Sequence, residues 1–234
     1  AAAGLYMMGH AFWEFGDPDW DRTKYFMLWG VAEDHASNPI KLGIEKLKRR
    51  GGKFVSINPV RTGYQAVADE WVPIKPGTDG ALALSMVHVL LSREQFDWDF
   101  LVRYTNAPFL VVQTTGERGD GMILRDADGQ PQAWDNVNGG FVNGMEPDIT
   151  PALFGEYVAP DGRPVKPVMQ LIAEKYLDSQ YAPEHAAKVC GVPAEQIERL
   201  ALEMAHVAFK ETIEIECEWT DWAGRKHDKM IGRP

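Results

Sequence analysis

The stretch KYFMLWGVAEDHASNPIKLGIEKLKRRGGKFVSINP, residues 24–59, decides the fold class. It opens with a near-continuous apolar run of strand length, as found in strands that are buried on both faces. An Asn-Pro pair then begins an amphipathic helical pattern that ends at two consecutive glycines, a helix stop signal. A second apolar run of strand length follows. Strand, helix and strand in this order predict a βαβ unit with parallel strands.

Regular elements continue along the chain on the C-terminal side of this unit. A third strand over residues 70–74 leads into a helix over 79–91, where Leu82, Met86, Val89 and Leu90 form an apolar stripe. Helices are also predicted over 96–106, 167–177, 183–191 and 193–209, and strands over 109–114 and 212–219. We therefore predict an α/β fold, with a doubly wound, Rossmann-like and mostly parallel sheet, flanking helices and a Gly/Asp/Pro-rich insertion.

Changes in composition divide the chain into five predicted parts. Residues 1–22 form a loop-rich lead-in from a preceding domain, and residues 23–115 form a dinucleotide-binding α/β core. Residues 116–166 are the insertion, in which RDADGQP (125–131) has the composition of a hairpin turn. Residues 167–219 close the same domain, and residues 220–234 begin a following segment.

Charge and hydropathy exclude several classes of protein. The 234 residues carry a net charge of −10 with acidic and basic residues interspersed, and KLKRR (46–50) is read as the solvated end of a helix. We therefore expect neither nucleic-acid binding nor direct membrane insertion, since an apolar run of the required length is also missing. Cys190 and Cys217 have no metal-ligand spacing, and we expect both thiols to be buried. The chain also reads as an internal part of a longer protein.

Polar residues and glycines follow three successive predicted strands. Gly30 and Glu33 follow the first, Asn58 and Arg61 the second, and the turn KPGTD (75–79) the third. The carboxyl ends of parallel strands meet at one edge of a sheet, where ligands bind. A helix N-terminus with nearby Arg and Lys suits a phosphate group, and carboxylates can accept hydrogen bonds from a purine. The structural alternative makes Asn38 and Thr78 helix caps and Arg61 a surface residue.

The long segment LWGVAEDHASNPIKLGIEKLKRRGGKFVSINPVRTGYQAVADEWVPIKPGTDGALAL (28–84) resembles the dinucleotide-binding region of the dimethyl-sulfoxide-reductase family of molybdopterin oxidoreductases. CGVPAEQIERLALEMA (190–205) is similar to the helix that closes the same region. The resemblance implies several α/β domains around a molybdenum or tungsten ion held by two molybdopterin guanine dinucleotides. Matched position by position, it implies that one dinucleotide is bound by Gly30, Glu33, Asn38, Asn58, Arg61, Thr62, Asp69, Lys75, Gly77, Thr78 and Asp79.

The resemblance also implies features that these residues do not contain. The family's iron–sulfur motif and its metal-ligating side chain would both lie upstream of residue 1, so we name no catalytic residue and no metal ligand in this chain. A 4Fe-4S cluster is expected in that upstream part. Position 58 carries Asn, where the family often has Asp, which leaves the role of this position open.

Two loop segments, FWEFGDPDWDRTKYFMLWGVAEDHASNPIK (12–41) and EWTDWAGRKHDKMIGRP (218–234), are similar to a membrane-associated subgroup. This subgroup includes the molybdenum subunits of quinone-linked sulfite dehydrogenases and polysulfide-reductase-like enzymes. The resemblance implies two-electron chemistry on a small oxyanion such as sulfite or on a sulfur compound.

Alternatives remain at this stage. They are a formate dehydrogenase-type activity, a non-catalytic structural or electron-relay subunit, and a nicotinamide-binding Rossmann domain, which the missing G-x-G-x-x-G disfavours. The resemblance implies two partners, an iron–sulfur electron-transfer subunit with a membrane quinone-reactive subunit. We expect a cytoplasmic location with membrane association through partners, and a periplasmic location stays open.

Overall fold

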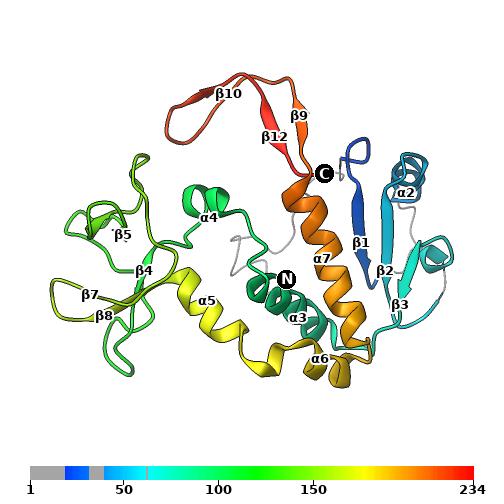
Figure 1. Cartoon of the computed structure of the whole chain (residues 1–234), viewed down its shortest axis with the longest axis horizontal. Helices are drawn as coiled ribbons and strands as arrows, with labels where there is room; N and C mark the ends of the chain where they lie inside the picture. Colours follow the sequence, from blue (N-terminus) through cyan, green and yellow to red (C-terminus); the bar gives the residue numbers. More distant parts are fainter. Residues whose placement is uncertain (1–18, 32–39, 62) are drawn as a thin grey trace. The chain divides into compact units, whose positions relative to one another are not determined.

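The computed structural model describes residues 19–31, 40–61 and 63–234 (Figure 1). The chain divides into two compact units. Unit 1 runs to Pro73 and includes Arg233–Pro234, and unit 2 runs from Ile74 to Gly232. The division lies inside the segment 23–115 that composition suggested as one domain.

Unit 1 contains the predicted βαβ unit and one further strand. Its elements are β1 (Tyr25–Trp29), α2 (Ile40–Arg49), β2 (Lys53–Ile57), the 3-10 helix η2 (Gly63–Ala66) and β3 (Glu70–Val72). The sheet order is β1-β2-β3, and both pairs of strands are parallel. The predicted parallel βαβ unit and the third strand are therefore confirmed, whereas the predicted helix start at Asn38-Pro39 lies outside the described residues.

The core of unit 1 lies between α2 and the sheet. Leu28, Ile44, Leu47, Phe54 and Tyr64 form its buried cluster. The indole of Trp20 lies against Gly43, where a side chain would not fit. Small size at this one helical position therefore lets the segment that precedes β1 pack on α2.

The basic end of α2 does more than face solvent. The Arg50 guanidinium donates hydrogen bonds to the carbonyl oxygens of Trp20, Asp21 and Thr23. The reading of KLKRR as a solvated helix end is thus incomplete, because its last residue fastens the segment that enters β1.

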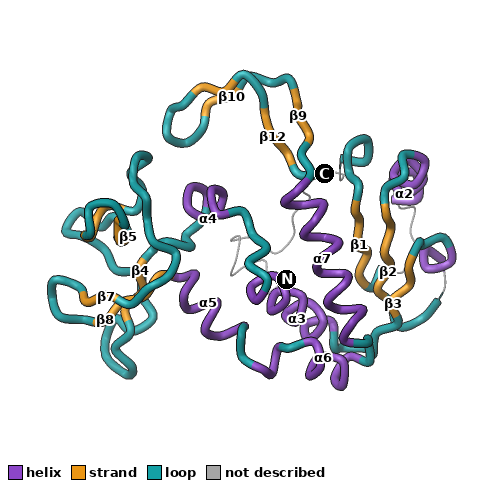
Figure 2. Tube along the Cα trace, viewed as in Figure 1, coloured by secondary structure: helices purple, strands orange, loops and turns teal. Residues whose placement is uncertain are grey.

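Several helices of unit 2 pack against α3 (Figure 2). The helices of this unit are α3 (Asp79–Ser92), α4 (Trp98–Tyr104), α5 (Val168–Tyr176), the 3-10 helix η3 (Ser179–Tyr181), α6 (Pro183–Cys190) and α7 (Ala194–Lys210). α3 contacts α5, α6 and α7. Leu82, Met86 and Val89 are buried as predicted, and Leu90 is half-buried.

The strands of unit 2 are all antiparallel. They are β4 (Leu110–Val112), β5 (Gln132–Asp135), β6 (Gly140–Asn143), β7 (Tyr157–Val158), β8 (Pro164–Pro167), β9 (Ile213–Ile215), β10 (Trp219–Thr220), β11 (Lys226–His227) and β12 (Met230–Gly232). They form the sheets β4-β8-β7, β5-β6, β9-β12 and β10-β11. The insertion contains β5, β6, β7 and most of β8, and the turn at 125–131 is confirmed by a bridge between Arg125 and Pro131.

The predicted sheet was too large. The fold is mixed α/β, but the parallel sheet of the described residues has three strands in the order β1-β2-β3. β4 pairs with β8 and β9 pairs with β12, so neither β4 nor β9 extends the parallel sheet.

The expectation for the two thiols is half wrong, since Cys190 is buried and Cys217 is exposed. Among the described residues, each helix is too short or too polar to cross a membrane.

Candidate functional site

The carboxyl edge of the sheet in unit 1 carries Gly30 and Asn58. The Gly30 N–H donates to Ile57 O (3.0 Å), and the Asn58 N–H donates to Val72 O (3.1 Å), so the parallel ladder continues one residue past the strand ends. Nothing lies within 4 Å of the place where a Cβ on Gly30 would sit. The strand end therefore has open space beside its backbone, as close approach of a ligand requires.

Asn58 is 8% exposed, and its side chain shapes the turn after β2. Its Oδ1 accepts a hydrogen bond from Val60 N (3.3 Å), the pattern of an Asx turn. Its carbonyl oxygen accepts from Trp71 Nε1 (2.8 Å). Asn58 is thus held by its own turn through the side-chain amide and by β3 through the backbone carbonyl, and the turn needs no negative charge on the side chain.

Arg61 is exposed, with its guanidinium carbon 5.7 Å from the centroid of the Trp71 ring. An aromatic face attracts a cation through its quadrupole and limits where the long side chain can move. Trp71 therefore organises both Asn58 and Arg61. The sequence shows Trp71 only as an apolar strand residue, so these two contacts could not be foreseen from it.

Asp69 lies at the opposite edge of this sheet, just before β3 begins. Its Oδ2 accepts from Phe54 N (2.8 Å), and its Oδ1 lies 2.8 Å from Lys48 Nζ. Burial raises the pKa of Asp69, but the Lys48 ammonium and the Phe54 N–H together hold this pKa below its ordinary value. The carboxylate is thus used to join α2, β2 and β3, and the structure separates it from Gly30 and Asn58.

In unit 2, the turn between Lys75 and Asp79 leads directly into α3. Gly77 has φ +77°, a conformation that side chains rarely adopt, with nothing within 4 Å of its missing Cβ. Lys75 O accepts both the Thr78 N–H (3.2 Å) and the Thr78 hydroxyl (2.7 Å). The predicted turn is therefore present, and its outer side is open at the glycine.

Thr78 stands at the N-cap position of α3 without capping it through its side chain. Its carbonyl oxygen accepts the N–H groups of Ala81 and Leu82, while its hydroxyl hydrogen points back to the turn. Asp79 is exposed and lies in the first helical turn, where a negative charge interacts favourably with the helix dipole. The first turn of α3 thus keeps N–H groups that its N-cap side chain does not satisfy.

Of the remaining predicted positions, the structure describes Lys75 alone. Lys75 Nζ donates to Lys188 O at 3.3 Å, so its ammonium contacts the end of α6. Glu33, Asn38 and Thr62 lie outside the described residues. In the described ranges, no group of three or more His, Cys, Asp and Glu side chains could hold a metal ion.

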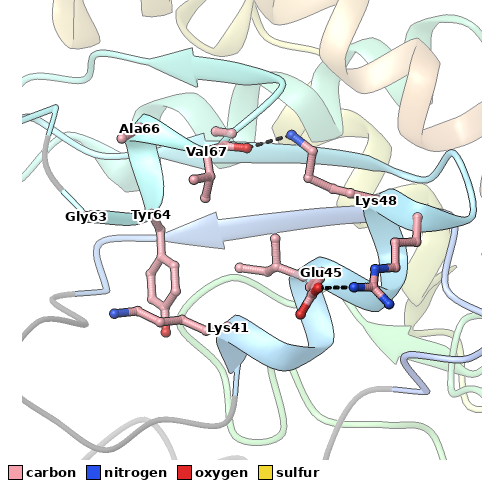
Figure 3. A pocket seen from close by; sticks show the side chains of 10 residues that line it. Lys41, Glu45, Lys48, Gly63, Tyr64, Ala66 and Val67 are labelled. Atoms are coloured by element: carbon pink, nitrogen blue, oxygen red, sulfur yellow. Dashed lines mark hydrogen bonds and ion pairs between the residues drawn. The ribbon is translucent and has the colours of Figure 1, made fainter.

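A groove of about 740 Å³ lies between α2 and η2 in unit 1 (Figure 3). Tyr64 lies beside Lys41, whose Nζ is 5.7 Å from the ring centroid. Lys48 Nζ donates to Val67 O at 2.6 Å, and Arg49 pairs with Glu45 at 2.5 Å. The charged rim is thus engaged in protein contacts, and the groove includes no residue that the sequence marked for cofactor binding.

Comparison with known proteins identifies the family of the chain. A family model described as molybdopterin oxidoreductase matches residues 4–107. A sulfite dehydrogenase subunit from Allochromatium vinosum is 49% identical across 100% of this chain and 25% of its own length. The chain belongs to the molybdopterin oxidoreductase family.

Other members of the family are more distant relatives. The alpha subunit of perchlorate reductase from Dechloromonas aromatica is 31% identical over 80% of this chain and 24% of its own length. A protein from Halobacterium salinarum, named for the catalytic subunit of a dimethyl sulfoxide reductase, is 33% identical over 78% of this chain and 22% of its own length. The chain spans about a quarter of the length of these molybdopterin oxidoreductases.

Proposed function

We propose that the protein to which this chain belongs is the catalytic subunit of a molybdopterin-dependent oxidoreductase that acts on a small oxyanion, with sulfite as the first candidate. The observation that carries the proposal is the 49% identity, along the entire chain, to the sulfite dehydrogenase protein of A. vinosum. The similarity extends along the loops and the antiparallel insertion as well as the family segment over 4–107.

This chain would bind one molybdopterin guanine dinucleotide through the residues that the sequence resemblance implies. In unit 1 the proposed residues are Gly30, Glu33, Asn38, Asn58, Arg61 and Thr62. In unit 2 they are Gly77, Thr78 and Asp79. Asp69 and Lys75 were predicted with them, but each already has protein partners through its charged group.

The described residues fit such a group on chemical grounds. Open space beside Gly30 and Gly77 lets a large ligand reach the backbone, where side chains would block it. The first turn of α3 presents N–H groups and the positive end of the helix dipole, which suit a phosphate. Arg61 adds a cation whose direction is set by Trp71. When bound, the molybdenum cofactor supplies a metal that exchanges two electrons with the substrate.

The partners and the cluster are part of the same proposal. The A. vinosum relative is named as one subunit of its enzyme, which implies further subunits there. We propose that a 4Fe-4S cluster outside this chain and an iron–sulfur partner subunit carry the electrons onward, towards a membrane quinone-reactive subunit.

The proposal is tested on the whole protein that contains this chain. Purified protein is analysed for molybdenum and tungsten, and guanine nucleotide is released with mild acid and quantified. About two guanine nucleotides per metal are expected for a bis-dinucleotide cofactor. Sulfite and formate are then compared as electron donors to an artificial acceptor. A folded protein that holds neither metal nor guanine nucleotide refutes the proposal and favours a non-catalytic subunit.

A second candidate is the reduction of an oxyanion. It is favoured by similarity to the perchlorate reductase of D. aromatica and to the molybdopterin-containing ArrA protein of the arsenate respiratory reductase of Chrysiogenes arsenatis, 34% identical over 41% of this chain. Assays in the reverse direction, with a reduced dye and perchlorate or arsenate, separate the two. Turnover with these acceptors and none with sulfite selects the reductase.

A further inference from the structure

Lys75 precedes α3 and contacts the C-terminal end of α6, where its partner Lys188 is 113 residues away in the sequence. The Lys75 N–H donates to Cys190 O at 2.9 Å, and the Lys75 Nζ donates to Lys188 O at 3.3 Å. The last carbonyl groups of a helix have no partner within the helix and form the negative end of its dipole. An ammonium group is therefore well placed there, and Lys75 contributes both a backbone and a side-chain donor.

The alkyl stem of Lys75 lies across the glycine that ends α6. Gly191 has φ +80°, the left-handed conformation of a helix C-cap, and its N–H donates to Ala187 O at 2.9 Å. A Cβ added to Gly191 would lie 3.3 Å from Lys75 Cε and 3.5 Å from Lys75 Cγ. Glycine thus serves two purposes here, since it permits the backbone turn and leaves room for the lysine stem.

The same lysine closes the turn that precedes α3. Its carbonyl oxygen accepts the Thr78 N–H and the Thr78 hydroxyl, while its own N–H is bound to α6. A hydrogen-bonded path therefore runs from Cys190 through Lys75 to Thr78. Cys190 is fully buried and α3 packs against α6, so both ends of this path belong to a packed layer of helices.

We propose that Lys75 is a positioning residue, which holds the turn before α3 against the end of α6 and does not contact the cofactor through its ammonium group. The inference rests on the proposed function, in which Gly77 and Thr78 meet the dinucleotide. A turn that is already ordered when the ligand arrives loses less conformational entropy on binding. Lys75 and Gly191 would thus increase cofactor retention from behind the site.

The test uses the whole protein, prepared with cofactor and from a host that makes none. Lys75→Met keeps the stem and removes the ammonium, and Lys75→Arg restores a donor. Gly191→Ala places a methyl against the stem. Lys188→Ala is the matched control, because it removes a neighbouring positive charge and leaves the accepting carbonyl in place.

Two quantities are measured for each variant: guanine nucleotide retained after dialysis, and hydrogen exchange of the Thr78 and Ala81 amides in cofactor-free protein. Loss of one hydrogen bond to a charged group predicts about tenfold faster exchange in Lys75→Met. Gly191→Ala should act in the same direction, while Lys75→Arg and Lys188→Ala stay close to wild type. Nucleotide retention should follow the same order.

Two outcomes overturn the inference. Lower nucleotide retention in Lys75→Met with unchanged exchange would mean that the ammonium contacts the cofactor directly. No change in either quantity would mean that Lys75 does not position the turn. Failure of the proposed function is distinguishable, because wild-type protein would then release no guanine nucleotide at all, while the exchange data still report on the contact with α6.

Discussion

Adding one methyl group at Gly77 should loosen the start of α3, while the same methyl at Gly80 should not. Gly77 has φ +77°, and Gly80 lies three residues later inside the helix. Nothing lies within 4 Å of either missing Cβ, so neither substitution introduces a steric clash. The two substitutions therefore differ only in backbone conformation.

The expected magnitudes have opposite signs. An alanine forced into the left-handed region costs about 1–2 kcal/mol. An alanine in place of a helical glycine gains up to about 1 kcal/mol. Since 1.36 kcal/mol corresponds to a tenfold change, Gly77→Ala should speed local opening by roughly five- to thirtyfold. Gly80→Ala should slow it.

Hydrogen exchange of the Ala81 and Leu82 amides reports this opening, because both donate to Thr78 O. The measurement uses cofactor-free whole protein, so that ligand contacts do not contribute. Equal or greater protection in Gly77→Ala than in Gly80→Ala would refute the reasoning. It would mean that the turn relaxes to a conformation that alanine accepts, and that glycine is not required there by the backbone.

Three further outcomes follow from burial and charge. Asp69→Asn should lower the melting temperature at neutral pH. The difference in melting temperature from wild type should shrink as the pH falls below 3.8, because the pKa of Asp69 is depressed in the folded protein and the stabilisation is lost when the carboxylate is protonated. A difference that persists at low pH would contradict this. Leu200→Ala should destabilise unit 2 by about 2–5 kcal/mol in a denaturant titration, since Leu200 is fully buried in α7. Val189 is 40% exposed, so Val189→Ala should lower the free energy of unfolding far less. A maleimide should label Cys217 in the native protein and spare Cys190 until unfolding, which peptide mass mapping decides; early labelling of Cys190 would mean that α6 opens readily.

The local elements of this fold could be predicted because their signals are local. The apolar run at Tyr25–Trp29, the helical stripe of α2 and the glycines after it all report on neighbouring residues. Strand partners were not predictable in the same way. The run at Leu110–Val112 indicates burial on both faces, but its partner β8 lies more than fifty residues away and runs antiparallel. An apolar strand pattern gives burial and does not give pairing direction.

The same distinction applies to the residues of the candidate site. The turn that contains Gly77 and Thr78 was recognisable because a Pro-Gly turn before a helix has a local signature. Lys75 was grouped with them as a cation near a phosphate site, yet its partners are backbone carbonyls of α6, which no residue type in the sequence marks. A cation beside a predicted turn is therefore weak evidence for ligand contact until its other neighbours are known.

Asp69 shows the limit of transferring a residue by its position in a motif. It precedes β3, and three residues of strand at about 3.3 Å each separate the two edges of the sheet. Its carboxylate is bound to the Phe54 N–H at the start of β2, whereas Asn58 follows the end of β2. The Asp69 carboxylate is engaged by Phe54 N and Lys48 at the amino edge, so we expect it to be unavailable to a ligand at the carboxyl edge. We therefore expect Asp69 to act on the proposed site through the register of β2 and β3. The first measurable effect of its replacement should be a lower free energy of unfolding.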